Sequence, residues 1–280
     1  MENIVKFPAL NLEFKIGRIA IPSKVIGIDI YWYAIIIASG ILLAFLYCSK
    51  EAKRQGMDKD LFIDILLWGI PAGIIGGRLY YVIFKWDYYS KNLGEIFAIR
   101  DGGLAIYGAI IFAVLAVYIY TKKNKISTLK VFDIGAIGLL IGQAVGRWGN
   151  FFNQEAFGGN TSLLWGMTSE KISSYLEMLK SRGINIDPSL PVHPTFLYES
   201  LWNFTGIIIF NYIIKRKRFD GQVFFGYIIW YGFGRMLIES LRTDSLYFLG
   251  FRISQIIGAF SVLIGIILYF LTKKKGVENG

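Results

Sequence analysis

A run of charged and amide side chains interrupts an apolar part of the sequence at residues 142–159. It contains Arg147, Asn150, Asn153 and Glu155, set among glycines and aromatic residues. An arginine inside a membrane-embedded helix costs roughly 3 kcal/mol on insertion scales and by default indicates a functional site. The plainer alternative is a helix end whose arginine reaches back to the membrane surface. The glycines beside Arg147 let a helix or a large ligand approach closely.

Two further arginines, Arg78 and Arg235, lie within apolar runs of their own. Guanidinium groups are permanently charged, forked donors that suit a phosphate, and nearby carboxylates keep an empty site from holding unpaired cations. Glu199 and Glu239 are such carboxylates, and Glu239 follows Arg235 by four residues on the same helix face. These residues predict a site for a phospholipid headgroup. The alternative is a set of arginine–glutamate pairs that only lock helices together.

The composition indicates which elements hold these residues. Of 280 residues, 54% are apolar, 16% aromatic and 18% charged, which is too apolar for a soluble domain of this length. The net charge of +10 lies in short clusters between apolar runs, which is typical of membrane proteins rather than of nucleic-acid binding. A single cysteine, Cys48, and a single histidine, His193, exclude a disulfide framework and offer no metal site. Neither a metal nor a cofactor is expected.

Seven apolar runs are each near the roughly 20 residues that a membrane-spanning helix needs. They predict an all-α polytopic integral membrane protein, a single membrane domain over residues 1–280, with helices at about 30–48, 61–84, 104–121, 131–152, 196–214, 222–241 and 253–271. The first long apolar run begins too late for a cleaved signal peptide, so the leader is expected to be retained. Alternation of Leu12, Phe14 and Ile16 with polar residues predicts either a short strand or an interfacial segment lying against the outer surface.

The lysines and arginines predict how these helices are oriented. With the N-terminus outside, the short inner loops hold fifteen of the 30 positive residues, and the longer outer segments hold twelve. The positive-inside rule therefore places the C-terminus in the cytoplasm. In this topology the three arginines within spans fall in the outer part of their helices, and Tyr33, Tyr107, Tyr198 and Glu199 fall near the outer start of theirs. The polar groups thus share one layer in the outer leaflet.

The segment from about 160 to 192, between the fourth and fifth helices, is the long soluble loop. Residues 173–180 within it have the apolar spacing of an amphipathic helix, which predicts a small extracytoplasmic cap over the site. Pro71 and the glycines of the second helix predict a kink and close helix packing. Such a kink would open a lateral path for lipid.

Several long motifs occur together in the chain. They are Gly146-Arg-Trp-Gly-Asn150-Phe-Phe-Asn153-Gln-Glu155, His193-Pro-Thr-Phe-Leu-Tyr198-Glu199, Tyr231-Gly-Phe-Gly-Arg235-Met-Leu-Ile-Glu239-Ser-Leu-Arg242, Gly76-Gly-Arg78-Leu-Tyr-Tyr and Trp32-Tyr33. Together they resemble the signature of the bacterial prolipoprotein diacylglyceryl transferase family, over residues from about 30 to 270. The seven helices, outside N-terminus and extracytoplasmic site of that family agree with the topology predicted from the charges.

The resemblance implies a reaction. The diacylglyceryl group of phosphatidylglycerol moves to the thiol of the lipobox cysteine in the signal peptide region of an exported prolipoprotein. A thioether forms and glycerol 1-phosphate leaves, which is the first step of lipoprotein maturation. The enzyme is then expected in the bacterial cytoplasmic membrane as a multi-pass protein among membrane lipid, with its active site facing the extracytoplasmic side and with no nucleic-acid partner.

The resemblance also implies roles for particular residues. Arg147 and Arg235 correspond to the family's essential arginines. The other positions expected to bind phosphatidylglycerol or to take part in catalysis are Asn150, Glu155, Gly158, Tyr33, Glu199, Glu239 and, at the edge of the layer, Arg78.

The chain departs from the family pattern at the start of the third helix, where Tyr107 stands in place of a histidine often proposed as the catalytic base. Tyrosine, with a reference pKa of about 10, is a poor base for a thiol with a reference pKa of about 8.5, although it can orient a substrate. We therefore expect Arg147 and Arg235 to hold the phosphodiester and stabilise the leaving group, while their positive field, assisted by a glutamate, favours the thiolate. His193 is a weaker base candidate and is expected to be structural.

Two other classes of protein fit parts of the sequence. A transporter for an anionic lipid of the outer leaflet, or for an anionic solute, would line a pore with the arginines. It would also need polar residues through the inner leaflet, where the helices are nearly all apolar. An intramembrane protease would need a serine–histidine pair or paired helical aspartates, and neither motif is present. The sequence favours the lipid transferase, with the transporter as the alternative.

Overall fold

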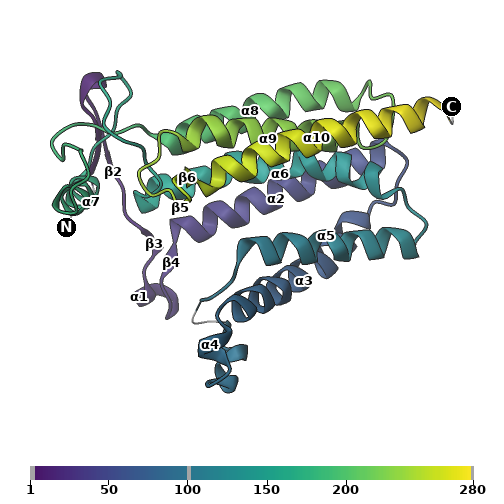
Figure 1. Ribbon diagram of the computed structural model, residues 1–280, viewed down its shortest axis with the longest axis horizontal. Helices are drawn as coiled ribbons and strands as arrows, with labels where there is room; N and C mark the ends of the chain where they lie inside the picture. Colours follow the sequence, from purple (N-terminus) through teal and green to yellow (C-terminus); the bar gives the residue numbers. More distant parts are fainter. Residues whose placement is uncertain (1–3, 100–101, 279–280) are drawn as a thin grey trace. The chain divides into compact units, whose positions relative to one another are not determined.

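The computed structural model describes residues 4–99 and 102–278 and is mostly helical (Figure 1). Each of the seven apolar runs forms a helix: α2 (Trp32–Arg54), α3 (Leu61–Phe84), α5 (Ile106–Lys123), α6 (Thr128–Asn153), α8 (Thr195–Ile214), α9 (Gln222–Glu239) and α10 (Ile253–Glu278). The shorter helices are α1 (Ser23–Ile26), α4 (Trp86–Tyr89) and α7 (Glu170–Ser181), with 3-10 turns η1 (Pro8–Leu10) and η2 (Leu93–Phe97).

The chain is mostly helical, and the prediction of an all-α fold is corrected by several short strands. β1 (Ile4–Phe7) pairs antiparallel with β2 (Leu12–Lys15). In the same way β3 (Ile19–Ile21) pairs with β4 (Ile30–Tyr31), and β5 (Tyr247–Phe248) pairs with β6 (Phe251–Arg252). The strand predicted from the alternation near the N-terminus is confirmed as β2.

Five of the described helices are long and apolar enough to cross a membrane, namely α2, α3, α5, α6 and α10. The other two long helices also contain ionisable residues of the predicted site, Glu199 on α8 and Arg235 with Glu239 on α9. The chain is therefore a helical, multi-pass membrane protein. The full set of seven spans and their orientation stay predictions.

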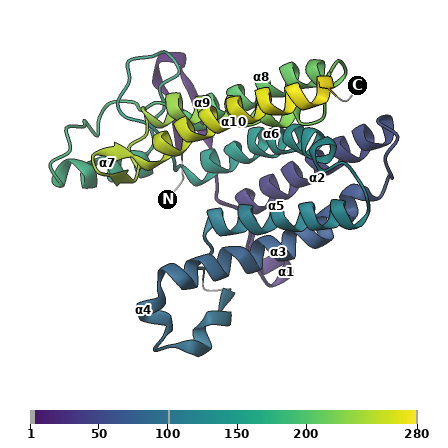
Figure 2. The same cartoon turned by 45° about the vertical axis from the view of Figure 1, so that its right-hand side comes forward.

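The fold divides into two compact units, Met1–Ala44 with Gly135–Gly280, and Phe45–Ile134. We call them the first and second unit, and the single membrane domain expected from the sequence stays a prediction. In the second unit α3 packs along α5 (Figure 2). A Cβ added to Gly76 or to Gly108 would collide with the carbonyl oxygen of the other glycine, so only glycine allows this approach. The close packing predicted for this glycine-rich helix is confirmed, and α3 continues through Pro71.

In the first unit α9 packs along α10 and against α8 (Figures 1 and 2). The first half of α2 approaches α6 at three glycines of α6. Gly40 lies against Gly142, Ile37 against Gly146 and Tyr33 against Gly149, where an added Cβ would come within 2.7 Å of the Tyr33 ring. The glycines on both sides of Arg147 thus admit a neighbouring helix, which is one of the two roles expected of them.

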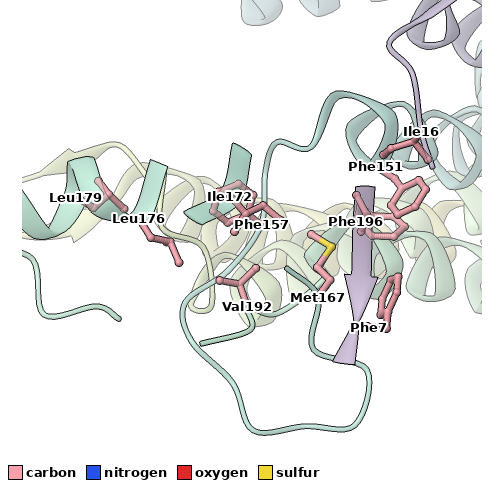
Figure 3. Close-up of a cluster of buried hydrophobic side chains, with 11 residues drawn as sticks. Phe7, Ile16, Phe151, Phe157, Met167, Ile172, Leu176, Leu179, Val192 and Phe196 are labelled. Atoms are coloured by element: carbon pink, nitrogen blue, oxygen red, sulfur yellow. The ribbon is translucent and has the colours of Figure 1, made fainter. Parts of the chain in front are cut away.

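The hairpin β1–β2 and α7 gather at one end of the first unit (Figure 1). A cluster of eleven buried hydrophobic side chains holds them there and joins them to the end of α6 and the start of α8 (Figure 3). Helix α7 buries Ile172, Leu176 and Leu179 on one face, and the Ser169 hydroxyl accepts a hydrogen bond from Ile172 N to cap its first turn. The amphipathic helix predicted for residues 173–180 is confirmed as part of α7.

Candidate active site

Three guanidinium groups converge on the carboxylate of Glu199 at the start of α8. Nη2 of Arg147 on α6 lies 2.6 Å from Oε2, and Nη1 of Arg235 on α9 lies 3.2 Å from the same oxygen. Nη1 of Arg242, three residues past the end of α9, lies 3.5 Å from Oε1. The Glu199 side chain is only 6% exposed. Burying a carboxylate is costly unless it is paired, and here three cations surround it.

Two further carboxylates balance the charge of the arginines. Glu239, one turn after Arg235 on α9, accepts from its Nη2 at 2.5 Å and is 3% exposed. Asp244 accepts from Nε and Nη2 of Arg242 at 2.9 and 2.7 Å. The three arginines and three carboxylates have a formal net charge of zero without a ligand. An anion that enters must therefore compete with the carboxylates for the guanidinium groups.

Asp244 lies in the loop between α9 and α10, where two effects act on its pKa. Burial raises the pKa of the carboxyl, but the hydrogen bonds and the charge of Arg242 outweigh burial and hold it below its usual range. For Arg242 burial acts to lower the pKa, while pairing with Asp244 raises it overall. Both groups therefore stay charged at neutral pH, and Arg242 is fixed as a cation beside Glu199.

Glu155 is connected to Arg147 through an asparagine. Asn150 and Asn153 each donate from Nδ2 to Oε1 of Glu155 at 3.0 Å, and the Asn150 side-chain oxygen lies 3.5 Å from Nη1 of Arg147. Lys171 of α7 donates to the backbone oxygen of Asn153 at 2.6 Å, which ties α7 to the end of α6. The polar side chains of Asn150, Asn153 and Glu155 therefore form one connected group with Arg147. Glu155 is the solvent-exposed carboxylate of this group.

The chain reverses after α6 and positions a glycine where no other residue fits. Gln154 and Ala156 take φ angles of 49° and 56°, in the left-handed region. Gly158 N then donates to His193 O at 2.9 Å, and an added Cβ on Gly158 would lie 2.7 Å from Leu241 O. Gly158 therefore acts here through close packing, and its expected contact with lipid stays a prediction.

The same segment explains how Arg242 reaches the site. Gly158 forms an isolated antiparallel bridge with Arg242, and Gly159 N donates to Leu241 O at 2.9 Å. These bonds hold the loop after α9 against the loop after α6, so the Arg242 side chain reaches Glu199. Arg242 was absent from the predicted site residues. One signal was present, because positions 235, 239 and 242 continue a single helical face.

Tyr33 lies close to the cluster, since its ring packs at Gly149, one residue before Asn150. Its expected contact with phosphatidylglycerol stays a prediction.

His193 has its backbone N and O bonded to Gly159 and Gly158, and its Nδ1 lies 3.1 Å from the Tyr198 hydroxyl. Burial lowers the pKa of His193. These contacts support the structural role expected for this histidine.

The last two predicted site residues belong to the second unit. Arg78, 7% exposed, donates to backbone oxygens of Glu95, Ile96, Gly102 and Gly103 at 2.6 to 3.1 Å. These bonds hold the connection between α3 and α5, so Arg78 has a structural role there, and its contact with lipid stays a prediction. Tyr107 is the second residue of α5 and is 44% exposed; its catalytic role also stays a prediction.

The fold and the site define a class of protein. It is a helical membrane protein in which arginines from different helices meet carboxylates in a largely buried cluster that suits an anionic headgroup. A model of the family described as prolipoprotein diacylglyceryl transferase matches residues 21–271. The chain belongs to this prolipoprotein diacylglyceryl transferase family and is a transferase.

Curated relatives agree over most of the chain. The phosphatidylglycerol–prolipoprotein diacylglyceryl transferase of Finegoldia magna is 44% identical over 257 residues, 91% of this chain and 96% of the relative. That of Listeria monocytogenes serotype 4b is 46% identical over 249 residues, 87% of this chain and 86% of the relative. That of Clostridioides difficile is 44% identical over 253 residues, 90% and 95% of the two chains.

Proposed function

We propose that this protein transfers the diacylglyceryl group of phosphatidylglycerol to the lipobox cysteine of exported prolipoproteins. The observation that carries the proposal is the convergence of Arg147, Arg235 and Arg242 on Glu199 in a chain of this family. A phosphodiester placed beside Glu199 would meet several forked donors that are already oriented by the carboxylate. This arrangement supports the transferase over a transporter, because the cations form one closed cluster rather than a row.

The transfer needs one bond to form and one to break. The cysteine thiolate attacks the carbon of the diacylglycerol that is esterified to phosphate, a C–S bond forms, and the bond between that carbon and its phosphate oxygen breaks. Glycerol 1-phosphate leaves with the electron pair. We assign the holding of the phosphate oxygens to Arg147 and Arg235, which stabilise the charge that builds on the leaving group. The same cations lower the pKa of an approaching thiol.

Glu155 is the carboxylate that we assign to the thiol proton. It is exposed, and Asn150 and Asn153 hold it by a single oxygen, Oε1. Its connection through Asn150 to Arg147 puts it in the same group as the lipid-binding arginine. A carboxylate is a weak base for a thiol, so its part is to receive the proton once the positive field has favoured the thiolate. Tyr107 is assigned the orientation of substrate.

In the membrane we place the protein with seven spans, the N-terminus outside and the arginine cluster in the outer leaflet of the bacterial cytoplasmic membrane. The support is the distribution of lysines and arginines, fifteen of which fall in the short inner loops of this arrangement. The cluster of α7 with the β1–β2 hairpin is then the extracytoplasmic cap. The prolipoprotein substrate, already exported up to its signal peptide, reaches the site from this side.

The test is transfer by the purified protein in vesicles. Protein, phosphatidylglycerol and a lipobox peptide are incubated, and the peptide is analysed by mass spectrometry. We expect the mass of one diacylglyceryl group on the cysteine and an equal amount of free glycerol 1-phosphate. A peptide with serine in place of the cysteine is the matched control. Movement of lipid between leaflets without modification of the peptide would support a transporter and contradict the proposal.

A further inference from the structure

A surface pocket of about 340 Å³ lies in the first unit, on the segments next to α7. Its walls are residues 8–9, 160–163, Gly166 and 190–191, and we call it the cap pocket. We propose that the cap pocket binds the uncharged residues of the peptide substrate that flank the reactive cysteine. This inference rests on the proposed function, because it assigns the second substrate of the same reaction to a part of the molecule.

The walls of the cap pocket are fixed by the buried cluster beneath them. Three of its four wall segments continue directly into a member of that cluster: Pro8 follows Phe7, Gly166 precedes Met167 and Pro191 precedes Val192 (Figure 3). The extended segments are also bonded to one another, since Met167 and Val192 exchange two backbone hydrogen bonds of 3.0 and 2.8 Å. A pocket with walls held in this way needs little ordering when a ligand binds.

The chemistry of the walls fits a polypeptide rather than a lipid headgroup. None of the residues that form the pocket carries a charge, so an anionic phosphate finds no cation there. The walls instead combine proline, leucine and alanine with the hydroxyls of Thr161 and Ser162, which can bond to a peptide backbone, while the Asn160 amide is bonded to the backbone of Asp187 and Leu190 and holds the wall in place. A volume of 340 Å³ lies within the range of about 300–1,000 Å³ typical of ligand pockets.

The rim of the cap pocket presents exposed apolar side chains. Leu163 and Trp165 are each 43% exposed and Leu164 is 61% exposed, in one continuous segment. The Trp165 indole N–H donates to the Tyr198 hydroxyl at 2.8 Å, which holds this segment against α8. An apolar rim around an uncharged pocket matches a substrate segment without charged side chains. It also matches a bilayer surface, and the experiment below distinguishes the two.

A short stretch of backbone links the wall of the cap pocket to the arginine cluster. Asn160 in its wall is two residues from Gly158, which bridges to Arg242, and two residues of extended chain span at most about 7 Å. On the rim, Trp165 binds Tyr198, the residue before Glu199. A peptide held in the pocket by the residues beside its cysteine therefore presents the thiol at the side of the cluster formed by Arg242 and Glu199.

The experiment fills the cap pocket with a large side chain and measures the KM for the peptide and the KM for phosphatidylglycerol separately. Ser162→Trp places a large side chain in the wall, and Ser174→Trp puts the same side chain on the exposed face of α7 as the matched control. We expect Ser162→Trp to raise the KM for a lipobox peptide by about tenfold or more, with kcat and the KM for phosphatidylglycerol within about twofold of wild type. Ala9→Phe, in a different wall segment, gives the same test if Ser162→Trp does not fold.

A second measurement does not depend on transfer. A lipobox peptide with serine in place of cysteine and a photoreactive residue beside it is cross-linked to the protein, and the product is mapped by mass spectrometry. Cross-links to residues 160–166 support the proposal, even if the wild type proves unable to transfer lipid. A wild type that transfers lipid, with an unchanged peptide KM in both pocket-filling variants, would overturn it. So would a change confined to the KM for phosphatidylglycerol, which would mean that the rim contacts the bilayer.

Discussion

Arg147 and Arg235 bind the same atom, Oε2 of Glu199, although they belong to different helices. One oxygen thereby fixes the spacing of two guanidinium groups, and Glu239 holds the second fork of Arg235. The two arginines are pre-oriented for a group of similar size and charge to the carboxylate. A phosphodiester is such a group, because guanidinium recognises carboxylate and phosphate by the same pair of parallel hydrogen bonds.

We expect Arg147→Lys and Arg235→Lys each to lower kcat/KM for lipid transfer by about 30-fold or more, because a point charge cannot replace a planar fork on a phosphodiester. The assay is the rate of diacylglyceryl transfer to a lipobox peptide. Arg218→Lys, on the exposed loop between α8 and α9, is the matched control and should keep wild-type activity. Near-normal turnover by both site variants would contradict the assigned role.

Glu199→Gln should destabilise the empty protein more than the lipid-bound protein. Glutamine keeps the size of the side chain but leaves three guanidinium groups with one counter-charge fewer, and breaking a buried pair costs about 3–5 kcal/mol. A bound phosphatidylglycerol headgroup restores a negative charge. We therefore expect a lower melting temperature for the variant without lipid and a larger rise on adding phosphatidylglycerol than in wild type. Equal rises in the two proteins would mean that the headgroup binds elsewhere.

Tyr107→Phe should lower the rate of transfer only modestly, because it keeps the aromatic ring and removes one hydrogen bond of about 1 kcal/mol net. Tyr107→His should also be active. In wild type and both variants the rate should rise with pH as the peptide thiol ionises. The measurement is the pH profile of transfer. Loss of all transfer in the phenylalanine variant, with fold and lipid binding intact, would show that the hydroxyl takes part in the chemistry.

Cys48→Ser should keep full activity. Cys48 lies on α2 fifteen residues beyond Tyr33, which corresponds to about 22 Å along the helix axis. The side chain is buried, with Sγ 3.7 Å from Ile134 O, and serine can keep that contact. We therefore expect no covalent intermediate on this sulfur. A serine variant that folds normally but transfers no lipid would overturn direct attack by the substrate thiol.

The Asp244 carboxyl should make the unfolding free energy sensitive to acid. Its pKa in the folded protein is below the unfolded value of about 3.9, so its stabilising contribution is complete above pH 4 and is lost as the pH falls through the folded pKa. Asp244→Asn should therefore be less stable than wild type at pH 6, and the gap should close below pH 4. Because the group is partly exposed, we expect about 1 kcal/mol or less. Thermal unfolding of both proteins across this range is the check.

The seven long helices could be predicted from the sequence because an apolar run of about 20 residues has few alternatives in a membrane protein. Helix α7 could also be predicted from the sequence, since its three buried residues follow helical spacing. The contact between Arg147 and Glu199 could not be predicted from apolar periodicity, because it depends on how helices α6, α8 and α9 pack. There the resemblance to a known family supplied what periodicity does not contain.

Two arginines show the limits of the sequence pattern. Arg78 was grouped with Arg147 and Arg235 because all three interrupt apolar runs, yet its donors are taken up by backbone oxygens of a connecting segment. Nothing in the side-chain pattern marks a carbonyl as a partner. Arg242 was left out although it continues the helical face of Arg235 and Glu239, and the backbone bonds to Gly158 and Gly159 that bring it beside Glu199 are not visible in the sequence.

The equality of arginines and carboxylates in the cluster bears on how the product leaves. Phosphatidylglycerol has one negative charge on its phosphate, whereas a released phosphomonoester has nearly two at neutral pH, since its second pKa is about 6. A site made only of arginines would hold its product more tightly than its substrate. Glu199 and Glu239 are tethered anions at a fixed, high local concentration, and they compete for the same guanidinium groups. We expect these carboxylates to displace the product and so speed turnover, and their removal should make the enzyme sensitive to inhibition by glycerol 1-phosphate.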